Sequence, residues 1–512
     1  MINRQGLRAV VLAVAALTIY ATRLGVSPIY LTHDEVIYAR NAYSIATTGR
    51  DLNGQFLPIS IPVTGTFYAT PANIYLTAAF LKVLPLSETT IRLPSVVVGL
   101  LCVCLVGLIA RRMLGTTYGL LAALILLLTP AHFIHSRLGT DHLYVVACVL
   151  AWWALLAREG KQIQAGRMFV ASAFLGLSLY TYLGATITAP ACVAITWVWL
   201  AMAGRKDPQI YVAAIGGFVF LAIPFVVWHL THPGQYAQQI RMYALYDSQT
   251  LDAAQGARAL VAPTSIAERG AVYWDYFNPS FLFFAGDTGL LNGTRYTGVF
   301  LLPMLILIPV GILTALIAGG SRRRLLVMLL VASPLAAVVV AERYRINRAL
   351  IMLPVAAILA TVAIEDLWRR RGRVGRWVAI VLVAGLPLQF GGFYRDYFGD
   401  YRVRSYPWFE YNLRGGMAEI IHRADDADQI WISDRLQWAD YYWPFYLDMS
   451  GRRELASRTH YLDPSQARLS DIGPGYVLCR ASEEQRFLDA GFTRVTAVLE
   501  PDQTHSLTVL RR

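Results

Sequence analysis

Acidic residues at two separate places in the sequence could carry out proton transfer. One is the run Thr32-His33-Asp34-Glu35, which follows the first apolar stretch, and the other is Asp141, which stands just before a later one. A carboxylate within hydrogen-bond reach of a hydroxyl group can accept its proton during a reaction. Carboxylates beside a membrane are seldom retained without a purpose. We therefore predict Asp34, Glu35 and Asp141 as catalytic residues.

Each of these acids also has a purely structural explanation. Thr32 and Glu35 have the spacing of a capping box, which predicts a helix that ends near Gly49. Acids at the N-terminus of a helix offset its dipole. Asp141 could likewise form an ion pair with Arg137, four residues earlier. Both explanations stay open from the sequence alone.

Three histidines stand close to Asp141 in the sequence. His132, His135 and His142 could bind a divalent metal together with that carboxylate. The spacing of these ligands is irregular, and histidine is often found at interfaces. We predict no definite cofactor, and a divalent metal held by these histidines is the alternative.

A second kind of chemistry is indicated by the run Glu342-Arg343-Tyr344-Arg345-Ile346-Asn347-Arg348. The guanidinium group matches phosphate oxygens with two parallel hydrogen bonds. Arg343, Arg345 and Arg348, together with Arg137, are therefore our candidates for binding a phosphate group. Anchoring to lipid head groups is the alternative explanation of the run.

Aromatic residues are dense between Tyr273 and Asp287. Such a stretch suits the aromatic belt of a membrane protein, and it suits equally well a lid over a lipid or a sugar. Tyr276 and Asp287 from this stretch, with Tyr344, are the candidates for contacts to an acceptor or for a lid.

Apolar segments make up most of the elements that must position these residues. The chain has 512 residues, of which 56% are hydrophobic and 15% are charged, against about 25% charge in soluble domains. Because runs of about 17 to 25 apolar residues can cross a bilayer, we predict about 11 transmembrane helices. They are 7–26, 92–110, 117–135, 142–157, 168–183, 185–203, 209–230, 297–318, 325–341, 349–366 and 377–393. The segment 71–86 begins with proline and contains Lys82, which predicts a juxtamembrane helix.

The net charge of +12 is divided unevenly along the chain. Residues 395–512 contain 15 basic and 18 acidic side chains, so residues 1–394 carry the whole basic excess. That excess lies in short hinges between the apolar segments, which is typical of the cytoplasmic side of a membrane. We therefore exclude nucleic acid as a partner. We predict a multi-pass protein of the cell (inner) membrane with a cytoplasmic N-terminus.

We predict that residues 1–394 form a polytopic α-helical membrane module. Residues 395–512 are predicted to form a small α/β domain on the extracytoplasmic (periplasmic) side. The alternation of apolar residues indicates strands at 429–433, 476–480, 494–499 and 506–510, and helices near 416–424 and 483–490. The domain contains no nucleophile, phosphate-loop or metal motif. We expect it to support assembly or acceptor binding.

Several motifs, in this order, resemble those of the GT-C glycosyltransferases. They are the acidic pair after the first span, the helix led by Pro71, Arg92-Leu-Pro-Ser at the second span and Arg137 to Asp141 at the fourth. The run Arg343 to Arg348, followed by Leu353-Pro354, resembles a late segment of the same superfamily. The likeness covers about residues 1–400. It is strongest with protein O-mannosyltransferases and lipid A aminoarabinose transferases, although Thr70-Pro71 replaces the usual double proline and no lysine stands near the acidic pair.

The resemblance implies transfer of a sugar from a polyprenyl-phosphate donor to a hydroxyl of a protein, lipid or glycan at the outer face of the membrane. Asp34 would accept the proton, and Glu35 or Asp141 would orient the acceptor or stabilise positive charge on the sugar. Arg345, with Arg343 or Arg348, would stabilise the phosphate leaving group. The alternatives are a secondary transporter or lipid flippase, and a non-catalytic scaffold for envelope assembly.

Overall fold

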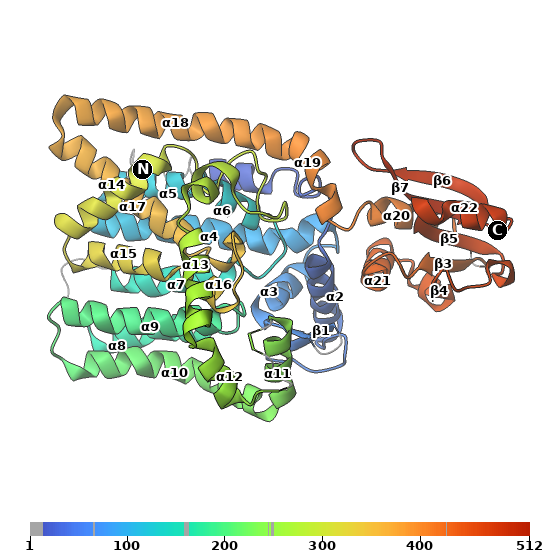
Figure 1. Ribbon diagram of the computed structural model, residues 1–512, viewed down its shortest axis with the longest axis horizontal. Coiled ribbons are helices and arrows are strands. Elements are labelled where there is room, and N and C mark those ends of the chain that lie inside the picture. Colours follow the sequence, from blue (N-terminus) through green and yellow to red (C-terminus); the bar gives the residue numbers. More distant parts are fainter. Residues whose placement is uncertain (1–13, 65–66, 158–162, 244, 247–249, 426) are drawn as a thin grey trace.

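The structure is a computed structural model that describes residues 14–512, apart from 65–66, 158–162, 244, 247–249 and 426. A bundle of helices fills the left of Figure 1, and a small domain with a β-sheet lies at the right. A thin layer containing α2, β1 and α3 lies between them. The predicted order of a helical module followed by an α/β domain is therefore present.

Most of the bundle consists of apolar helices that coincide with the predicted spans. Their bounds are Glu88–Leu114 (α4), Thr116–Leu127 (α5), Pro130–His135 (α6), Tyr144–Leu156 (α7), Ala165–Ser178 (α8), Ala185–Met202 (α9), Pro208–Thr231 (α10), Met304–Ile317 (α14), Ser321–Ala332 (α15), Leu335–Val339 (α16), Met352–Arg370 (α17) and Gly372–Phe398 (α18). The predicted span 7–26 begins outside the described residues, and residues 14–21 are helical. The basic hinge at 158–161 also lies outside them.

Four of the described helices, α4, α9, α10 and α18, are long and apolar enough to cross a membrane. Others are shorter because their sequences interrupt the helix. Residues 117–135, for example, divide into α5 and α6 at Pro130, where proline restricts the preceding residue and has no N–H to donate. The apolar helical bundle is confirmed, but the count of 11 transmembrane helices is not.

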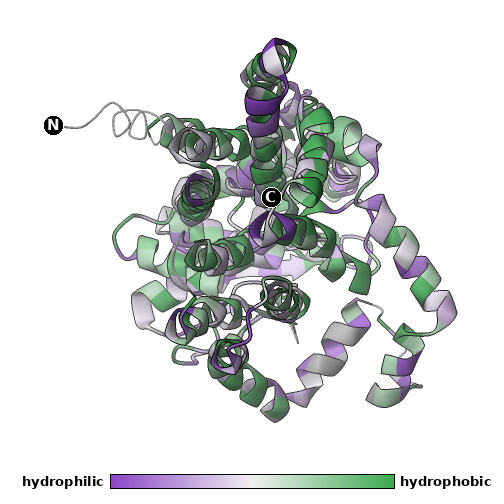
Figure 2. Ribbon diagram, turned by 90° about the vertical axis from the view of Figure 1, so that its left-hand side faces the viewer, coloured by the Kyte–Doolittle hydropathy of each residue, from purple (hydrophilic) through white to green (hydrophobic). Residues whose placement is uncertain are grey.

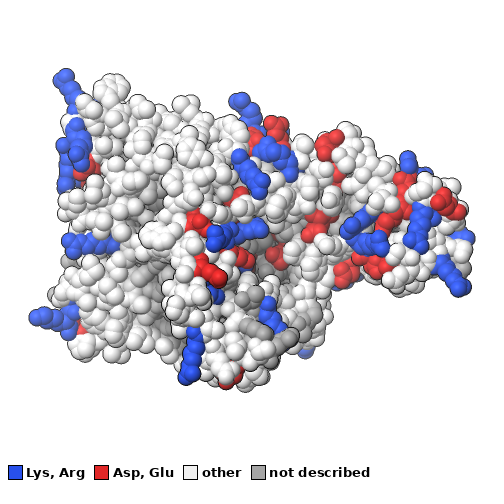
Figure 3. Space-filling view, in the orientation of Figure 1, with Lys and Arg blue, Asp and Glu red and all other residues white. Residues whose placement is uncertain are grey.

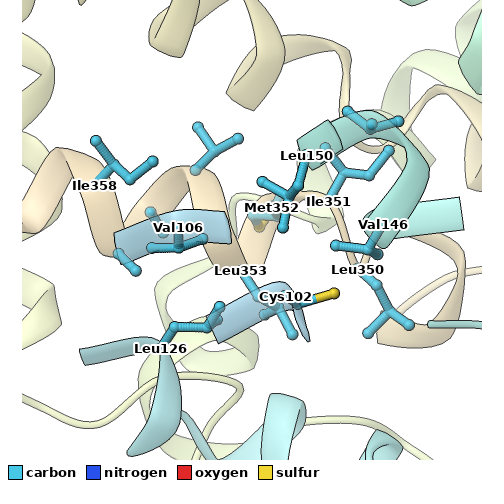
Figure 4. Close-up of a cluster of buried hydrophobic side chains, with 14 of the residues drawn as sticks. Cys102, Val106, Leu126, Val146, Leu150, Leu350, Ile351, Met352, Leu353 and Ile358 are labelled. Carbon is cyan, nitrogen blue, oxygen red and sulfur yellow. The ribbon is translucent and has the colours of Figure 1, made fainter. Parts of the chain in front are cut away.

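Hydrophobic residues are found along the outer helices of the bundle as well as in its interior (Figure 2). Leu388 on α18, for example, is 77% exposed, which suits contact with lipid rather than water. Inside, side chains from α4, α5, α7 and α17 pack against one another (Figure 4), among them Val106, Leu126, Val146 and Leu353, all fully buried. This core fixes the outward ends of the helices that carry the polar residues.

The middle layer consists of α2 (His33–Thr48), the antiparallel hairpin of β1 (Ile61–Thr64) and β2 (Phe67–Ala69), and α3 (Pro71–Leu81). The predicted capping box is present: the Thr32 hydroxyl accepts from Glu35 N, and the Glu35 carboxylate accepts from Thr32 N. Helix α2 ends at Gly49, whose φ of 76° suits glycine. The predicted helix at Pro71 is also present, whereas the hairpin was not predicted.

Shorter elements pass along the side of the bundle toward the middle layer. They are α11 (Pro233–Met242), α12 (Ala253–Leu260), α13 (Pro263–Asp275), the π-helix η1 (Ser280–Ala285) and the 3-10 turn η2 (Ile346–Arg348). Helices α11 and α12 lie near the lower edge of the molecule in Figure 1, and α13 rises from there across the bundle. Helices α11, α12, α13 and η1 lie between the predicted spans 209–230 and 297–318, and η2 lies between the predicted spans 325–341 and 349–366.

The C-terminal domain contains a five-stranded sheet in the order β4-β3-β5-β7-β6, in which β3 is parallel to both β4 and β5 and β7 is antiparallel to β5 and β6. Its elements are α19 (Asp400–Ser405), η3 (Tyr406–Trp408), α20 (Leu413–Arg423), β3 (Gln429–Ser433), α21 (Ala439–Ser450), η4 (Arg453–Arg458), β4 (Thr459–Leu462), η5 (Leu469–Asp471), β5 (Gly475–Arg480), η6 (Ala481–Glu483), α22 (Glu484–Asp489), β6 (Thr493–Leu499) and β7 (His505–Arg511). The four predicted strands and two predicted helices are confirmed. Strand β4 and helix α21 were not predicted, and α18 continues past residue 394 to Phe398.

Lys and Arg side chains gather at the left-hand end of the bundle, opposite the C-terminal domain (Figure 3). The hinges at this end include Arg111 at the end of α4, Arg322 at the start of α15, and Arg369 at the end of α17. Acidic and basic side chains are mixed near the other end, where the bundle meets the middle layer. These three described hinges therefore share one end of the bundle, as the sequence predicted.

Candidate active site

A cavity of about 320 Å³ lies where the bundle meets the middle layer. Its walls come from the start of α2, the β1–β2 hairpin, the loop between α6 and α7, the turn before α9, the segment after α11 and the loop around η2. Its charged or titratable lining residues include His33, Asp34, Asp141, His142, Glu342, Arg345 and Arg348. Carboxylates from the first third of the chain thus share one cavity with arginines from its last third.

Asp34 is the second residue of α2, and the capping box places it at the cavity wall. Its side chain is 42% exposed, so a bound molecule could reach the carboxylate. Burial by the cavity walls raises the pKa of Asp34, although the positive charges of His33 and Arg348 oppose that rise. A raised pKa makes this carboxylate a better proton acceptor at neutral pH.

Asp141 lies in the loop between α6 and α7 and faces the same cavity. Its Oδ2 atom accepts a hydrogen bond of 3.0 Å from the Thr70 hydroxyl. Burial, together with the charge of Asp34, raises the pKa of Asp141 to about 7. Two carboxylates in one cavity disfavour double ionisation, so one can hold a proton while the other accepts one.

Glu35 lies outside the cavity, although it is the neighbour of Asp34. Its fully buried carboxylate pairs with Arg92, with 2.7 Å between Oε1 and Nε, and also accepts a 2.8 Å hydrogen bond from Gly139 N. The Arg92 guanidinium also donates to the backbone carbonyls of Leu24, Pro28 and Tyr30. Glu35 therefore links α2 to α4 and to the loop that carries Asp141. It holds Asp34 and Asp141 in place without lining the cavity itself.

Loss of the Glu35 charge is expected to destabilise the fold. In Glu35→Gln the buried Arg92 would lose its only ion-pair partner among the described residues, which should cost about 3 kcal/mol. Thermal unfolding in detergent, followed by tryptophan fluorescence, should show a midpoint several degrees below that of the wild type. The control is Glu419→Gln, which breaks a half-exposed pair with Arg423 and should change stability by at most about 0.5 kcal/mol. Equal midpoints for the two variants would contradict the positioning role.

Arg348 is held firmly at the cavity by its neighbours. Its Nη1 donates a 2.6 Å hydrogen bond to the Tyr182 hydroxyl, its Nε pairs with Glu342 at 2.8 Å, and its guanidinium lies 5.2 Å from the centre of the Tyr243 ring. Burial lowers the pKa of Arg348, but Tyr182 and Glu342 outweigh it and raise the pKa above its ordinary value. The side chain therefore presents a permanent positive charge.

Arg345 also lines the cavity, and it is positioned by residues that were predicted to touch an acceptor or form a lid. Asp287, whose pKa burial raises to about 6, lies 3.7 Å from Arg345 Nη1 and accepts a 2.8 Å hydrogen bond from Ile346 N. Tyr276 donates a 2.8 Å hydrogen bond to Glu342 O. Tyr344 donates a 2.8 Å hydrogen bond to Asp275 on α13. These three residues hold the arginine loop from outside the cavity lining.

Two of the four arginines predicted to bind phosphate lie away from the cavity. Arg343 is 55% exposed and pairs with Asp275 at 3.3 Å. Arg137 is fully buried, donates to the carbonyls of Tyr20 and Ser27, and lies against the ring of Phe133. Arg137 is not paired with Asp141, so the predicted ion pair is absent from the described contacts. Arg345 and Arg348 are therefore the pair that can meet a bound phosphate.

The three candidate metal ligands are spread over different environments. The buried His132 is hydrogen-bonded to Gly99 O at 3.1 Å, and His135 contacts His142 only through their rings, 5.9 Å apart. His142 lines the cavity, where burial lowers its pKa well below the ordinary value. Among the described residues, no three His, Cys, Asp or Glu side chains are grouped closely enough to hold a metal ion. The geometry gives no support to the metal alternative.

Several cavity residues escaped the sequence analysis. They are Tyr38 on α2, Thr70 before α3, Tyr182 before α9, Tyr243 after α11, and Asn347 in η2. Tyr182 carried a weak signal, because it stands at the end of the predicted span 168–183, beside the short turn that precedes the span 185–203. Single tyrosine, threonine and asparagine residues in loops are otherwise too common to single out without the fold.

Comparison with known proteins places this geometry in a known fold. The sequence profile of dolichyl-phosphate-mannose-protein mannosyltransferases matches residues 69–228. The structure of ArnT from Cupriavidus metallidurans in the apo state is similar over 98% of this chain and 97% of its own, with 15% sequence identity and a TM-score of 0.61. The structure of ArnT bound to undecaprenyl phosphate covers the same shares of both chains, with 12% sequence identity and a TM-score of 0.59. No curated protein matches the sequence.

A more distant structure shows the same arrangement. The archaeal oligosaccharyltransferase AglB from Archaeoglobus fulgidus, in complex with an inhibitory peptide and a dolichol-phosphate, is similar over 98% of this chain and 74% of its own, with 12% identity and a TM-score of 0.54. The chain therefore has the fold of the GT-C glycosyltransferases. The resemblance predicted from the sequence is confirmed at the level of the fold.

Proposed function

We propose that the protein is a membrane glycosyltransferase that moves a sugar from a polyprenyl-phosphate-linked donor to a hydroxyl group of a protein, a lipid or a glycan. The observation that carries this proposal is the shared cavity, in which Asp34 and Asp141 meet Arg345 and Arg348. A lipid phosphate as the donor is supported by the undecaprenyl phosphate and the dolichol-phosphate in the structures of ArnT and AglB.

The proposed reaction uses charged side chains of both signs. Asp34 accepts the proton of the acceptor hydroxyl as its oxygen attacks the anomeric carbon, because an alcohol is a weak nucleophile. The bond between that carbon and the phosphate oxygen breaks, and its electron pair leaves with the phosphate. Arg348 and Arg345 stabilise the negative charge of this leaving group. Asp141, which holds a proton for part of the time near neutral pH, donates a hydrogen bond to the sugar or the acceptor.

In this proposal the cavity and the C-terminal domain face the outside of the cell, and the N-terminus lies in the cytoplasm. Support comes from the basic hinges, which gather at the opposite end of the bundle (Figure 3), since basic loops are retained on the cytoplasmic side. Residues 1–394 then form the catalytic module, and residues 395–512 form an extracytoplasmic domain.

The expected result in proteoliposomes is transfer of labelled sugar from a polyprenyl-phosphate donor to an envelope fraction that supplies acceptors. One molecule of polyprenyl phosphate should be released for each sugar transferred, and a nucleotide sugar alone should give no transfer. Protein-free liposomes are the control. Movement of the donor across the bilayer without release of polyprenyl phosphate would instead indicate a flippase, and neither release nor movement would indicate a scaffold; both results contradict the proposal.

A further inference from the structure

His33 stands between the cavity and the C-terminal domain. Its Nε2 atom lies 3.5 Å from Asp34 Oδ1, and its Nδ1 atom lies 3.6 Å from Glu410 Oε1. The imidazole ring is stacked on the indole ring of Trp438, with 4.8 Å between ring centroids and 11° between their planes. Two side chains of the C-terminal domain therefore fix the position of the residue next to Asp34.

The C-terminal domain is held firmly at this contact. On α21 the Tyr442 hydroxyl donates a 2.7 Å hydrogen bond to Leu31 O, and the Tyr446 hydroxyl donates a 3.0 Å hydrogen bond to Glu88 Oε1. Apolar residues of both parts also share one buried cluster, in which Leu31 and Val36 pack together with residues of α20 and α21. The contact with His33 is thus part of a rigid interface.

Both residues that reach His33 have a strained backbone. Glu410 has a φ of 58° and Trp438 a φ of 60°, values in the left-handed region that residues other than glycine seldom adopt. Such strain persists only where the surrounding structure enforces it, and it concentrates at functional sites. Here the left-handed residue Trp438 opens α21, and the strain aims an indole ring and a carboxylate at the same imidazole.

We infer that the C-terminal domain completes the active site, because Trp438 and Glu410 act as positioning residues that hold a protonated His33 against Asp34. This inference rests on the proposed function. Trp438 fixes the plane of the ring, and the Glu410 carboxylate, 3.6 Å from Nδ1, favours a proton on that atom, so that the Nε2 proton faces Asp34. The positive charge favours the ionised form of Asp34 that must accept a proton from the acceptor.

The charges around the pair support this arrangement. Burial lowers the pKa of His33, but the nearby carboxylates of Glu410 and Asp34 outweigh it and raise the pKa above its ordinary value. The other titratable groups that act on His33, on Asp34 or on their contacts are Glu35 and Tyr38 of α2, Asp141 before α7, Arg348 in η2 and Tyr442 of α21. His33 and Arg348 are the basic residues among these described groups. Of the two, His33 is the residue that contacts side chains of the C-terminal domain.

The pH dependence of transfer by the full-length protein in proteoliposomes tests the inference. In His33→Gln the loss of the positive charge raises the pKa of Asp34, so the acidic limb of the profile should move upward by about one pH unit. Glu410→Gln should move it in the same direction by less, because it makes His33 easier to deprotonate. Trp438→Phe should keep the wild-type profile by preserving a stacked ring, whereas Trp438→Ala should behave like His33→Gln.

The matched control is Tyr446→Phe, which removes a hydrogen bond from the same interface without touching His33. Its profile should equal that of the wild type. The inference is overturned if His33→Gln leaves the acidic limb in place, or if Tyr446→Phe moves it equally. Full transfer by Asp34→Asn would be a different failure, because it would reject the proposed mechanism itself whatever the His33 variants did.

Discussion

Asp34→Asn is expected to lower the rate of sugar transfer by about 10²- to 10⁴-fold, the range for loss of a general base. The amide has nearly the shape of the carboxylate but cannot accept the proton of the acceptor hydroxyl. The side chain faces the cavity and makes no buried ion pair like that of Glu35, so the fold should remain intact. Initial rates in proteoliposomes at saturating donor measure the effect.

The control for this variant is Glu268→Gln, which removes an exposed carboxylate from α13, outside the cavity lining. It should transfer sugar at the wild-type rate. Unfolding midpoints of both variants should match that of the wild type, which separates a lost base from a lost fold. A rate for Asp34→Asn within a factor of about three of the wild-type rate is far below the loss expected for a base and would rule out this role for Asp34.

Arg348→Met is expected to reduce transfer by about 10²- to 10³-fold, a loss comparable to that of one donor that stabilises a transition-state anion. The leaving phosphate gains charge as its bond to the sugar breaks, and Arg348 is the cavity arginine with the most fixed position. Arg348→Lys should recover only part of the rate, because an ammonium group keeps the charge but lacks the planar pair of donors.

Arg343→Met provides a matched control from the same loop. Arg343 pairs with Asp275 at the surface and does not line the cavity, so its loss should leave the rate within about twofold, as for an exposed ion pair. Single-turnover rates with bound donor should show the difference between the two variants. Equal losses of transfer rate in Arg348→Met and Arg343→Met would show that the total positive charge of the loop matters, and they would contradict a specific role for Arg348.

The sequence predicted local features well where neighbouring residues determine them. The start of α2 follows from Thr32 and Glu35, and its end follows from Gly49, because a capping box and a left-handed glycine act over a single turn. The strands of the C-terminal domain follow from alternating apolar residues. Helix α21 was missed because its interior contains Pro444, and proline disfavours the interior of a helix.

The site could be predicted only in part, because contacts between distant segments decide it. Asp34 and Glu35 are adjacent and chemically alike, yet successive helical residues point in different directions, so one faces the cavity and the other meets Arg92. Arg343 and Arg345 are also close in the sequence, yet Arg343 pairs with Asp275 at the surface and Arg345 lines the cavity. The contact of α2 with α4 decides that Asp34 rather than Glu35 reaches the cavity. The contact of α13 with the arginine loop decides the same for Arg345 over Arg343.

The division of the cavity between distant parts of the chain has a consequence for biogenesis. Asp34 is synthesised about 310 residues before Arg345 and Arg348, and Asp141 about 200 residues before them. A nascent chain that has inserted only its first helices therefore holds two carboxylates in a recess without either cavity arginine, an arrangement that like-charge repulsion disfavours. Insertion of the segment around η2 relieves this repulsion. The same event adds the two arginines that we propose bind the phosphate, so in this proposal a partly inserted chain has no complete site for a lipid phosphate.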